Sequence, residues 1–377
     1  MIDSDIPATK EKSFISSWMT SLIQPQIIGL DISDLSTKYI SFGRAKNNKL
    51  NITFFGEIAH PEGIITNGEI KNEEALGEIL EKWFLKKKKE LPSPFVAISL
   101  PEEKSFIRLV QIPTVKPQDV ANAIRWEIEN QIPLPLEEVI YDYEIITSLR
   151  DNKDHLDVLI TAFPKELLMS YVRTIKKAGL EPYVIEIEPQ ALVRACAAPL
   201  RDKEAKIILD VGRTRTGLVI FAEGSILYTA TLDAGGIAFE QSIARTLGVS
   251  LDEAKKIKID VGLDKTAHNG DVFSALASVV TIIADEIVRA TSYYDSHALH
   301  AHGAAPTIGQ ILISGGDANL KGLDTYLASV SRIRVERIDP FFAIQNRMAH
   351  AIPPLTKREA LCYTTAIGLA LRDIRQE

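Results

Sequence analysis

The stretch LDVGRTRTG (209–217) decides the fold of this chain. It ends an apolar strand on Asp210, makes a polar turn and then opens a second apolar strand. The same order occurs in LDISDLSTK (30–38), where a strand runs through Asp31 into a polar turn and a new strand. Because a third strand follows each segment, the sequence predicts an internal duplication and therefore two related lobes.

Both motifs place an acidic residue at the end of a strand, directly before a tight turn. Amides and hydroxyl groups in such a turn can hold a polyphosphate while the carboxylate orients Mg²⁺ or its waters. A third segment, ISGGDANLKGL (313–323), adds glycines that allow close backbone approach to a ligand. The candidate phosphate-binding residues are Asp31, Ser33, Ser36, Lys38, Asp210, Gly212, Arg213, Thr214, Gly315, Gly316 and Asp317. Capping of the turns is the alternative role for the two aspartates.

Apolar periodicity predicts an α/β chain with an α+β insert between its halves. In the first half we expect a helix at 73–90 and strands at 26–32, 36–44, 49–59 and 94–100. The insert should contain helices at 117–130, 164–178 and 189–198, and strands at 141–147, 156–163 and 182–187. The second half should contain helices at 272–296, 320–330 and 358–373, and strands at 206–212, 216–224, 225–233, 310–316 and 334–339.

The composition is that of an ordinary globular protein. Of 377 residues, 46% are apolar and 25% are charged, and the formal net charge is −7, so nothing indicates a nucleic-acid partner. Cys196 and Cys362 lack the spacing of a metal site, and they fit a reducing cytoplasm. The sequence contains no P-loop, GxSxG, GxGxxG or HExxH motif, so no motif supports the enzyme classes that use them.

Residues 1–25 form a leader before the first predicted strand. A short amphipathic helix is predicted at 12–24 by the spacing of Phe14, Ile15, Trp18, Met19, Leu22 and Ile23. We expect this stripe to pack on the protein's own body or to stay loosely ordered, because it lacks the basic polar face that suits anionic lipid. Docking on a membrane or on a partner is the alternative.

Three further segments carry a resemblance to a known family: AIRWEIENQIPLPLEEVIYDYEI (123–145), LGVSLDEAKKIK (247–258) and ISGGDANLKGLDTYL (313–327). The two aspartate motifs resemble those of the actin, heat-shock chaperone and sugar-kinase superfamily. The three segments narrow this resemblance to the PilM family of type IV pilus assembly proteins, which are relatives of FtsA. The resemblance implies a two-lobed, actin-like α/β fold of the ribonuclease H-like kind. Its parts would be the leader (1–25), subdomain 1A (26–100), the 1C insert (101–200), and lobe 2 (201–377) with subdomain 2B at about 235–275 and a C-terminal return helix.

The resemblance also implies two binding surfaces. ATP with Mg²⁺ would bind between the lobes as a conformational clamp, with Lys258 joining the residues named above and with Asp31 and Asp210 holding the ion through its waters. A groove between 1A and 1C would take the N-terminal cytoplasmic peptide of an inner-membrane PilN-like protein, through Arg125, Trp126, Glu127, Gln131 and Pro133. The chain would be a cytoplasmic scaffold at the inner face of the inner membrane, not an enzyme.

The turns depart from the family's pattern. The family's first turn usually reads Asp-Ile-Gly-Ser-Ser-Ser, and its later positions here hold Ser33, Asp34 and Leu35. Asp34 should repel a phosphate, whereas Arg213 and Arg215 in the second turn should bind it and offset that charge. The superfamily's ribose-contacting Glu lies three residues before Lys258, where this chain has Lys255. We therefore expect no efficient hydrolysis.

Two other functions stay open. A phosphotransferase of the sugar-kinase branch would need a general base for a substrate hydroxyl, and Asp210 is the candidate. An FtsA-like polymerising protein would normally carry a C-terminal amphipathic membrane helix, and the charges of LALRDIRQE (369–377) argue against one.

Overall fold

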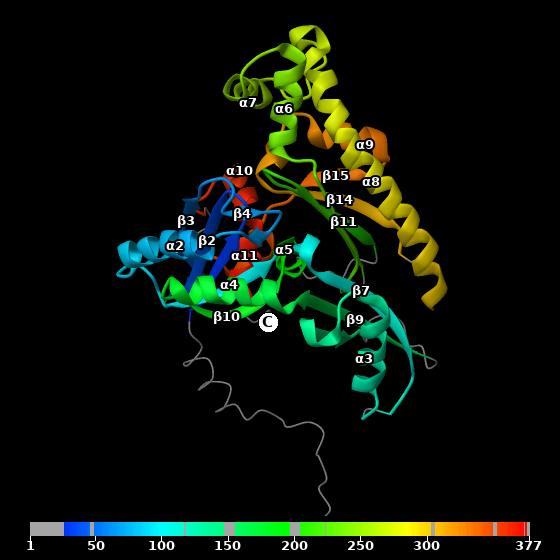
Figure 1. Cartoon of the computed structure of the whole chain (residues 1–377). Coiled ribbons are helices and arrows are strands. Elements are labelled where there is room, and N and C mark those ends of the chain that lie inside the picture. Colours follow the sequence, from blue (N-terminus) through cyan, green and yellow to red (C-terminus); the bar gives the residue numbers. More distant parts are fainter. Residues whose placement is uncertain are drawn as a thin grey trace, which may run out of the picture.

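The computed structural model describes residues 26–45, 49–116, 118–146, 155–196, 204–222, 224–302, 306–349, 353–372 and 374. The predicted helix at 12–24 and Pro117 lie outside these residues. Figure 1 shows two lobes that face each other, with a small α+β insert beside them and the helices α6 and α7 at the far end of the second lobe. The predicted two-lobed α/β architecture is therefore confirmed.

The first lobe is built on a five-stranded sheet with the order β10-β6-β1-β2-β3. Its strands are β1 (Ile28–Ile32), β2 (Ser36–Arg44), β3 (Leu50–Ala59), β6 (Phe95–Leu100) and β10 (Glu181–Ile187). The first three strands pair in antiparallel fashion, whereas β6 and β10 run parallel to β1. Ile28 and Leu30 on the central strand are fully buried, and burial of each such side chain contributes about 2 kcal/mol.

The second lobe repeats this sheet, with the order β13-β12-β11-β14-β15. Its strands are β11 (Ala205–Val211), β12 (Thr216–Ala222), β13 (Ser225–Leu232), β14 (Ile308–Ser314) and β15 (Arg334–Arg337). Again three strands are antiparallel and two run parallel to the central one. The strand order and directions match those of the first lobe, so the predicted duplication is confirmed.

The first lobe includes a helix from the C-terminal end of the chain. The first lobe holds α2 (Glu73–Lys87), α4 (Lys165–Lys177), α5 (Glu188–Cys196) and α11 (Thr364–Ala370). The last of these packs on β1, β2 and α5, so the C-terminus returns to the first lobe. Where α5 and α11 cross, Gly368 lies against the backbone of Ala191, and a Cβ at 368 would be 1.9 Å from the carbonyl oxygen of Ala191.

The second lobe holds α6 (Gly236–Leu247), α7 (Leu251–Asp260), α8 (Asp271–His302), α9 (Leu323–Ser331) and α10 (Lys357–Ala360). The region predicted as subdomain 2B contains α6, α7 and the start of α8, and none of residues 236–275 is in a strand. The helix predicted at 358–373 is divided, because a 3₁₀ turn, η6 (Leu361–Tyr363), separates α10 from α11. Another predicted helix, at 117–130, is α3 (Val120–Gln131).

The insert is smaller than predicted. It is a three-stranded sheet, β7 (Phe106–Pro113), β9 (His155–Pro164) and β8 (Val139–Ile145), covered on one side by α3. The predicted end of the insert at residue 200 is wrong, because β10 pairs with β6 of the first-lobe sheet and α4 packs on α2. A short apolar run such as PYVIEI fits either sheet, so only the pairing of distant strands decides where it belongs.

Candidate functional site

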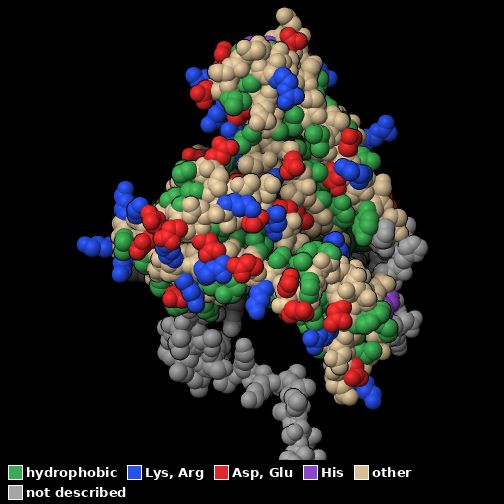
Figure 2. Space-filling model, in the orientation of Figure 1, with side chains coloured by type: hydrophobic (Ala, Val, Ile, Leu, Met, Phe, Trp, Pro, Cys, Tyr) green, Lys and Arg blue, Asp and Glu red, His purple; other side chains and the backbone are tan. Residues whose placement is uncertain are grey.

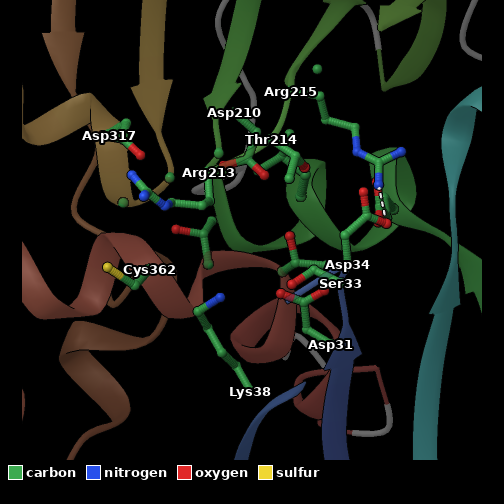
Figure 3. A pocket seen from close by; sticks show the side chains of 18 of the residues that line it. Asp31, Ser33, Asp34, Lys38, Asp210, Arg213, Thr214, Arg215, Asp317 and Cys362 are labelled. Carbon is green, nitrogen blue, oxygen red and sulfur yellow. Dashed lines mark ion pairs between the residues drawn. The ribbon is translucent and has the colours of Figure 1, made fainter. Parts of the chain in front are cut away.

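A cavity of about 460 Å³ lies between the lobes, which is within the usual range for a small-ligand site. The β1–β2 turn lines it from the first lobe, and the β11–β12 turn and the segment after β14 line it from the second. Figure 3 shows Asp31, Asp34 and Lys38 facing Asp210 and Arg213 across this space. Residues from both predicted phosphate turns therefore converge on one cavity.

Eleven of the twelve residues predicted to bind nucleotide line the cavity. They are Asp31, Ser33, Ser36, Lys38, Asp210, Gly212, Arg213, Thr214, Gly315, Gly316 and Asp317. Lys258 does not line it: its side chain is buried beneath the wall, where the ammonium lies 2.9 Å from a carboxylate oxygen of Glu240 and also contacts Asp317. The structure therefore does not bring the Lys258 ammonium to the cavity lining, where two carboxylates already neutralise it, and its contact with nucleotide stays a prediction.

Local hydrogen bonds set the shape of the two turns. Both the amide N–H and the hydroxyl of Ser33 donate to the carbonyl oxygen of Ser36 at 2.9 Å. In the second turn the amide of Gly212 donates to the carbonyl of Arg215 at 2.9 Å. Gly315 adopts φ +90°, and a Cβ there would lie 2.3 Å from the carbonyl oxygen of Val211, so only glycine fits this approach of two backbones.

Three carboxyl groups give the cavity its electrostatic character. Burial, followed by the charge of Asp31, raises the pKa of Asp210 to about 6, although the nearby Ser314 hydroxyl and the charge of Lys38 oppose this. Burial likewise raises the pKa of Asp31. Burial and the nearby carboxylates, Asp31 first among them, hold the pKa of Glu188 well above its usual range. Buried carboxyl groups with raised pKa values are suited to bind a divalent cation or its waters. The positive charge of the cation would favour the ionised form of each carboxyl group.

Glu188 was not predicted from the sequence. It is the first residue of α5 and follows directly after β10, whose C-terminal end lies at the same sheet edge as that of β1. The signal in the sequence is an acidic residue directly after an apolar strand, as at the two aspartate motifs. It was missed because β10 was assigned to the insert and not to the first-lobe sheet.

An ion pair joins the two turns across the cleft. The Arg215 guanidinium lies 2.7 Å from a carboxylate oxygen of Asp34, and it also contacts the carboxylate of Glu103. Asp34 in addition accepts a hydrogen bond at 2.9 Å from the buried amide of Gly68. Arg215 therefore offsets the charge of Asp34, as predicted. It does so by direct contact, so the guanidinium that was expected to bind a phosphate binds the Asp34 carboxylate in this structure.

The other arginine of the second turn is also paired. Arg213 makes a bidentate contact with Glu240, with 2.6 Å between Nη2 and Oε2. Its guanidinium therefore belongs to the same buried network as Lys258 and Asp317. Glu240 thus accepts one hydrogen bond from each terminal nitrogen of Arg213, and a phosphate would have to share this guanidinium with Glu240.

The charges around the cavity favour a cation over a bare anion. The lining includes three basic side chains, Lys38, Arg213 and Arg215, against seven carboxyl groups. Within the described part of the chain, no three His, Cys, Asp or Glu side chains converge closely enough to hold a metal ion alone. The donor set thus fits a magnesium ion that brings oxygen ligands from water or phosphate, and it fits an isolated phosphate poorly.

The predicted partner residues lie far from this cavity, on α3 and the segment after it. The helix buries Val120, Ile124 and Ile128 against its own sheet. On its other side the side chain of Trp126 is 64% exposed, which is unusual for so large an apolar group. The remaining predicted residues, Arg125, Glu127, Gln131 and Pro133, are exposed or half-buried beside it.

Comparisons with known proteins agree with this architecture. The chain is 20% identical over 354 residues to the cell division protein FtsA of Bacillus subtilis (strain 168), covering 83% of this chain and 78% of that protein. Among solved structures, a PilM-PilN type IV pilus biogenesis complex matches with a TM-score of 0.73 and 22% identity, over 93% of this chain and 98% of that one. MreB5 of Spiroplasma citri bound to ADP matches with a TM-score of 0.54 and 12% identity, over 93% and 97%.

These likenesses show an actin-like fold. The family model described as "Type IV pilus assembly protein PilM" matches residues 29–374, which is most of the chain. The resemblance drawn from the aspartate motifs and the RWEIENQIPLP segment is therefore confirmed. This chain belongs to the PilM family of type IV pilus assembly proteins.

Proposed function

We propose that this chain is an actin-like scaffold of the inner-membrane platform that assembles type IV pili. In this role it binds the N-terminal cytoplasmic tail of a PilN-like membrane protein. The observation that carries the proposal is the exposed face of α3, where Trp126 is 64% exposed while the opposite face of the helix is buried against the insert sheet. A solved relative is a PilM-PilN complex, which supports a partner of the same kind.

The location follows from the same role. Within the described residues, the structure has no helix that combines the length and the apolar character needed to cross a bilayer. We propose that the chain works in the cytoplasm and reaches the inner face of the inner membrane through its partner. Exposed aromatic side chains such as Trp126 are common anchors in protein interfaces, which supports a binding role for α3.

We further propose that the cleft binds ATP with Mg²⁺. Asp31, Asp210 and Glu188 would orient the ion through its waters, and Gly315 would let the backbone approach the ligand. Bound Mg²⁺ would supply positive charge that balances the phosphates and the excess of carboxylates. MreB5 of Spiroplasma citri, which shares this fold, has been solved bound to ADP and bound to AMPPNP, which supports a nucleotide as the ligand.

The nucleotide would act as a clamp and not as a substrate. Lobe closure around ATP would shift the population of insert orientations and change affinity for the partner. Efficient hydrolysis is not expected, because Asp34 and Arg215 occupy the turn positions that would otherwise position the phosphates. The chain would therefore not be an enzyme.

A titration tests both halves of the proposal. The full chain is titrated with a synthetic N-terminal tail of a PilN-like protein, with and without ATP and Mg²⁺. We expect saturable binding that changes by roughly 5- to 150-fold when nucleotide is present. Absence of tail binding would overturn the scaffold, whereas tail binding that is indifferent to nucleotide would overturn only the clamp.

One observation favours the phosphotransferase alternative. A carboxyl group with a pKa of about 6, as at Asp210, is well suited to act as a general base near neutral pH. An assay of ADP release across a panel of polyols separates the two functions. Polyol-dependent ADP release that is lost in Asp210→Asn would replace the scaffold proposal with the enzyme.

A further inference from the structure

The edge of the first-lobe sheet opposite the cleft carries exposed lysines and exposed apolar side chains. Because β1, β6 and β10 run parallel, their C-terminal ends share the cleft side and their N-terminal ends share the far side. The helix α2 ends at this far edge, since only a short link separates Lys87 from the start of β6 at Phe95. Figure 2 shows Lys and Arg side chains at this end of the first lobe, next to acidic side chains.

We call this surface the basal edge and define it by Leu85, Lys86, Lys88, Lys89 and Tyr183. Leu85 is 60% exposed and Tyr183 is 48% exposed, although both are large and apolar. The Tyr183 ring meets that of Phe95 edge-on, with 5.8 Å between the ring centroids. In the described part of the chain no carboxylate forms an ion pair with any of the three lysines.

A role in stabilising α2 does not account for this surface. Lysines in the last turn of a helix do interact favourably with its dipole, and Lys86 lies there. Lys88 and Lys89, however, follow the last helical residue. The dipole also gives no reason for Leu85 to stand exposed between charged neighbours. The combination of exposed lysines with an exposed leucine and tyrosine is typical of surfaces that contact a lipid headgroup region.

The described part of the chain begins near the same place. The carbonyl oxygen of Gln26, the first described residue, accepts a hydrogen bond from the Ser93 hydroxyl in the link between α2 and β6. Ser93 is four residues beyond Lys89, so Gln26 is held close to the end of the lysine run. The sequence of residues 1–25 carries the apolar residues Phe14, Trp18 and Leu22 at helical spacing but no basic face of its own. The basal edge supplies that positive charge from another part of the chain.

We propose that the basal edge docks on an anionic lipid bilayer, in addition to any contact through a protein partner. The three lysines would contact lipid phosphates, while Leu85 and Tyr183 would enter the headgroup region. Electrostatic attraction and a modest apolar insertion act together here, and stable attachment of peripheral proteins commonly needs two such signals. This inference goes beyond the scaffold function and does not rest on it.

Vesicle flotation of the full chain tests the proposal. The probes are phosphatidylcholine vesicles with about one-third phosphatidylglycerol and vesicles of phosphatidylcholine alone. We expect binding to the anionic vesicles only, and weakening as salt is added. Each lysine near an anionic surface contributes about fivefold in affinity, so the variant Lys86→Gln, Lys88→Gln, Lys89→Gln should bind roughly a hundredfold more weakly. Leu85→Ser should lose about tenfold.

A matched variant guards against a general effect of charge. Lys255→Gln, Lys256→Gln, Lys265→Gln removes the same charge from exposed positions on the second lobe and should bind anionic vesicles as the parent does. All altered side chains are exposed, so circular dichroism should be unchanged in every variant. Equal loss in both triple variants, equal binding to neutral vesicles, or binding of polyglutamate in the absence of vesicle binding would overturn the proposal.

Discussion

Arg215 of the second lobe pairs with Asp34 of the first lobe across the cleft, with 2.7 Å between Nη2 and Oδ1. The two side chains are only 18% and 10% exposed, so water screens the pair less than it would at the surface. Because the residues come from the two phosphate turns, the pair links the two lobes directly. A phosphate entering the cleft would have to compete with Asp34 for the guanidinium.

Removal of the Asp34 charge should therefore improve nucleotide binding. Asp34→Asn keeps the oxygen that accepts from the Gly68 amide but removes the carboxylate. We expect affinity for ATP with Mg²⁺ to rise about tenfold, because Arg215 is released and repulsion of the phosphates falls by about 1.4 kcal/mol. Calorimetric titration measures the affinity.

The control for this substitution is Asp285→Asn, which removes a carboxylate from an exposed position on α8 and should leave affinity unchanged. Scattering at small angles should also report a larger radius of gyration for Asp34→Asn without ligand, since the lobes lose a direct link. An unchanged or weaker affinity in Asp34→Asn would show that the ion pair does not compete with nucleotide.

The raised pKa of Asp210 predicts a pH-dependent cost in stability. Its pKa is about 6 in the folded protein and near 3.8 ordinarily, so between these values the folded chain binds more protons than the unfolded chain. Stability therefore falls as pH rises through this window, and the cost is fully present above about pH 6. Asp210→Asn should raise the free energy of unfolding by about 3 kcal/mol at pH 7.5 and by little near pH 4.

Urea denaturation at the two pH values measures this difference. The same variant should lose Mg²⁺-dependent nucleotide binding, because an amide carries no charge for the ion. A gain in stability that is equal at both pH values would contradict the assignment, since the cost would then come from packing.

The exposed tryptophan of α3 predicts a loss of binding without a loss of stability. Trp126→Ala should weaken binding of a PilN-like tail at least tenfold, because buried aromatic anchors often contribute more than 1.4 kcal/mol to an interface. The free energy of unfolding should change by less than about 0.5 kcal/mol, as for other exposed sites. Phe342→Ala, at a side chain that is 61% exposed elsewhere, is the control. Equal weakening in both variants would argue against α3 as the binding face.

The close crossing of α5 and α11 predicts that a side chain at Gly368 strongly lowers the stability of the fold. Gly368→Ala places a Cβ 1.9 Å from the carbonyl oxygen of Ala191, so the two helices must separate. We expect a loss of about 3 kcal/mol in the free energy of unfolding. Gly217→Ala is the matched control, because a Cβ there meets no atom within 4 Å. Thermal unfolding compares the two, and similar melting temperatures would contradict the close approach.

The strands and the two aspartate motifs could be predicted from the sequence because their structure depends on residues that are close together in the chain. Alternating and continuous apolar runs predict β1, β2, β11 and β12 to within two residues of their observed bounds. The repetition of one strand–turn–strand pattern predicts two lobes, and two equivalent turns then converge on a single cleft. A window of about ten neighbouring residues is enough to predict a strand and the turn after it, because strand formation and turn chemistry depend on residues that are close in the sequence.

Only the tertiary structure decided which sheet takes β10, where Lys258 and Arg213 find their partners, and that Arg215 reaches Asp34. Each of these outcomes depends on the distance between groups that lie far apart in the sequence. Charge and hydrogen bonding favour whichever counter-group the packed lobes bring within reach, and a linear pattern does not specify that distance. The sequence alone thus determined the kind of groups in the cleft, and packing of the lobes determined which of them are already paired.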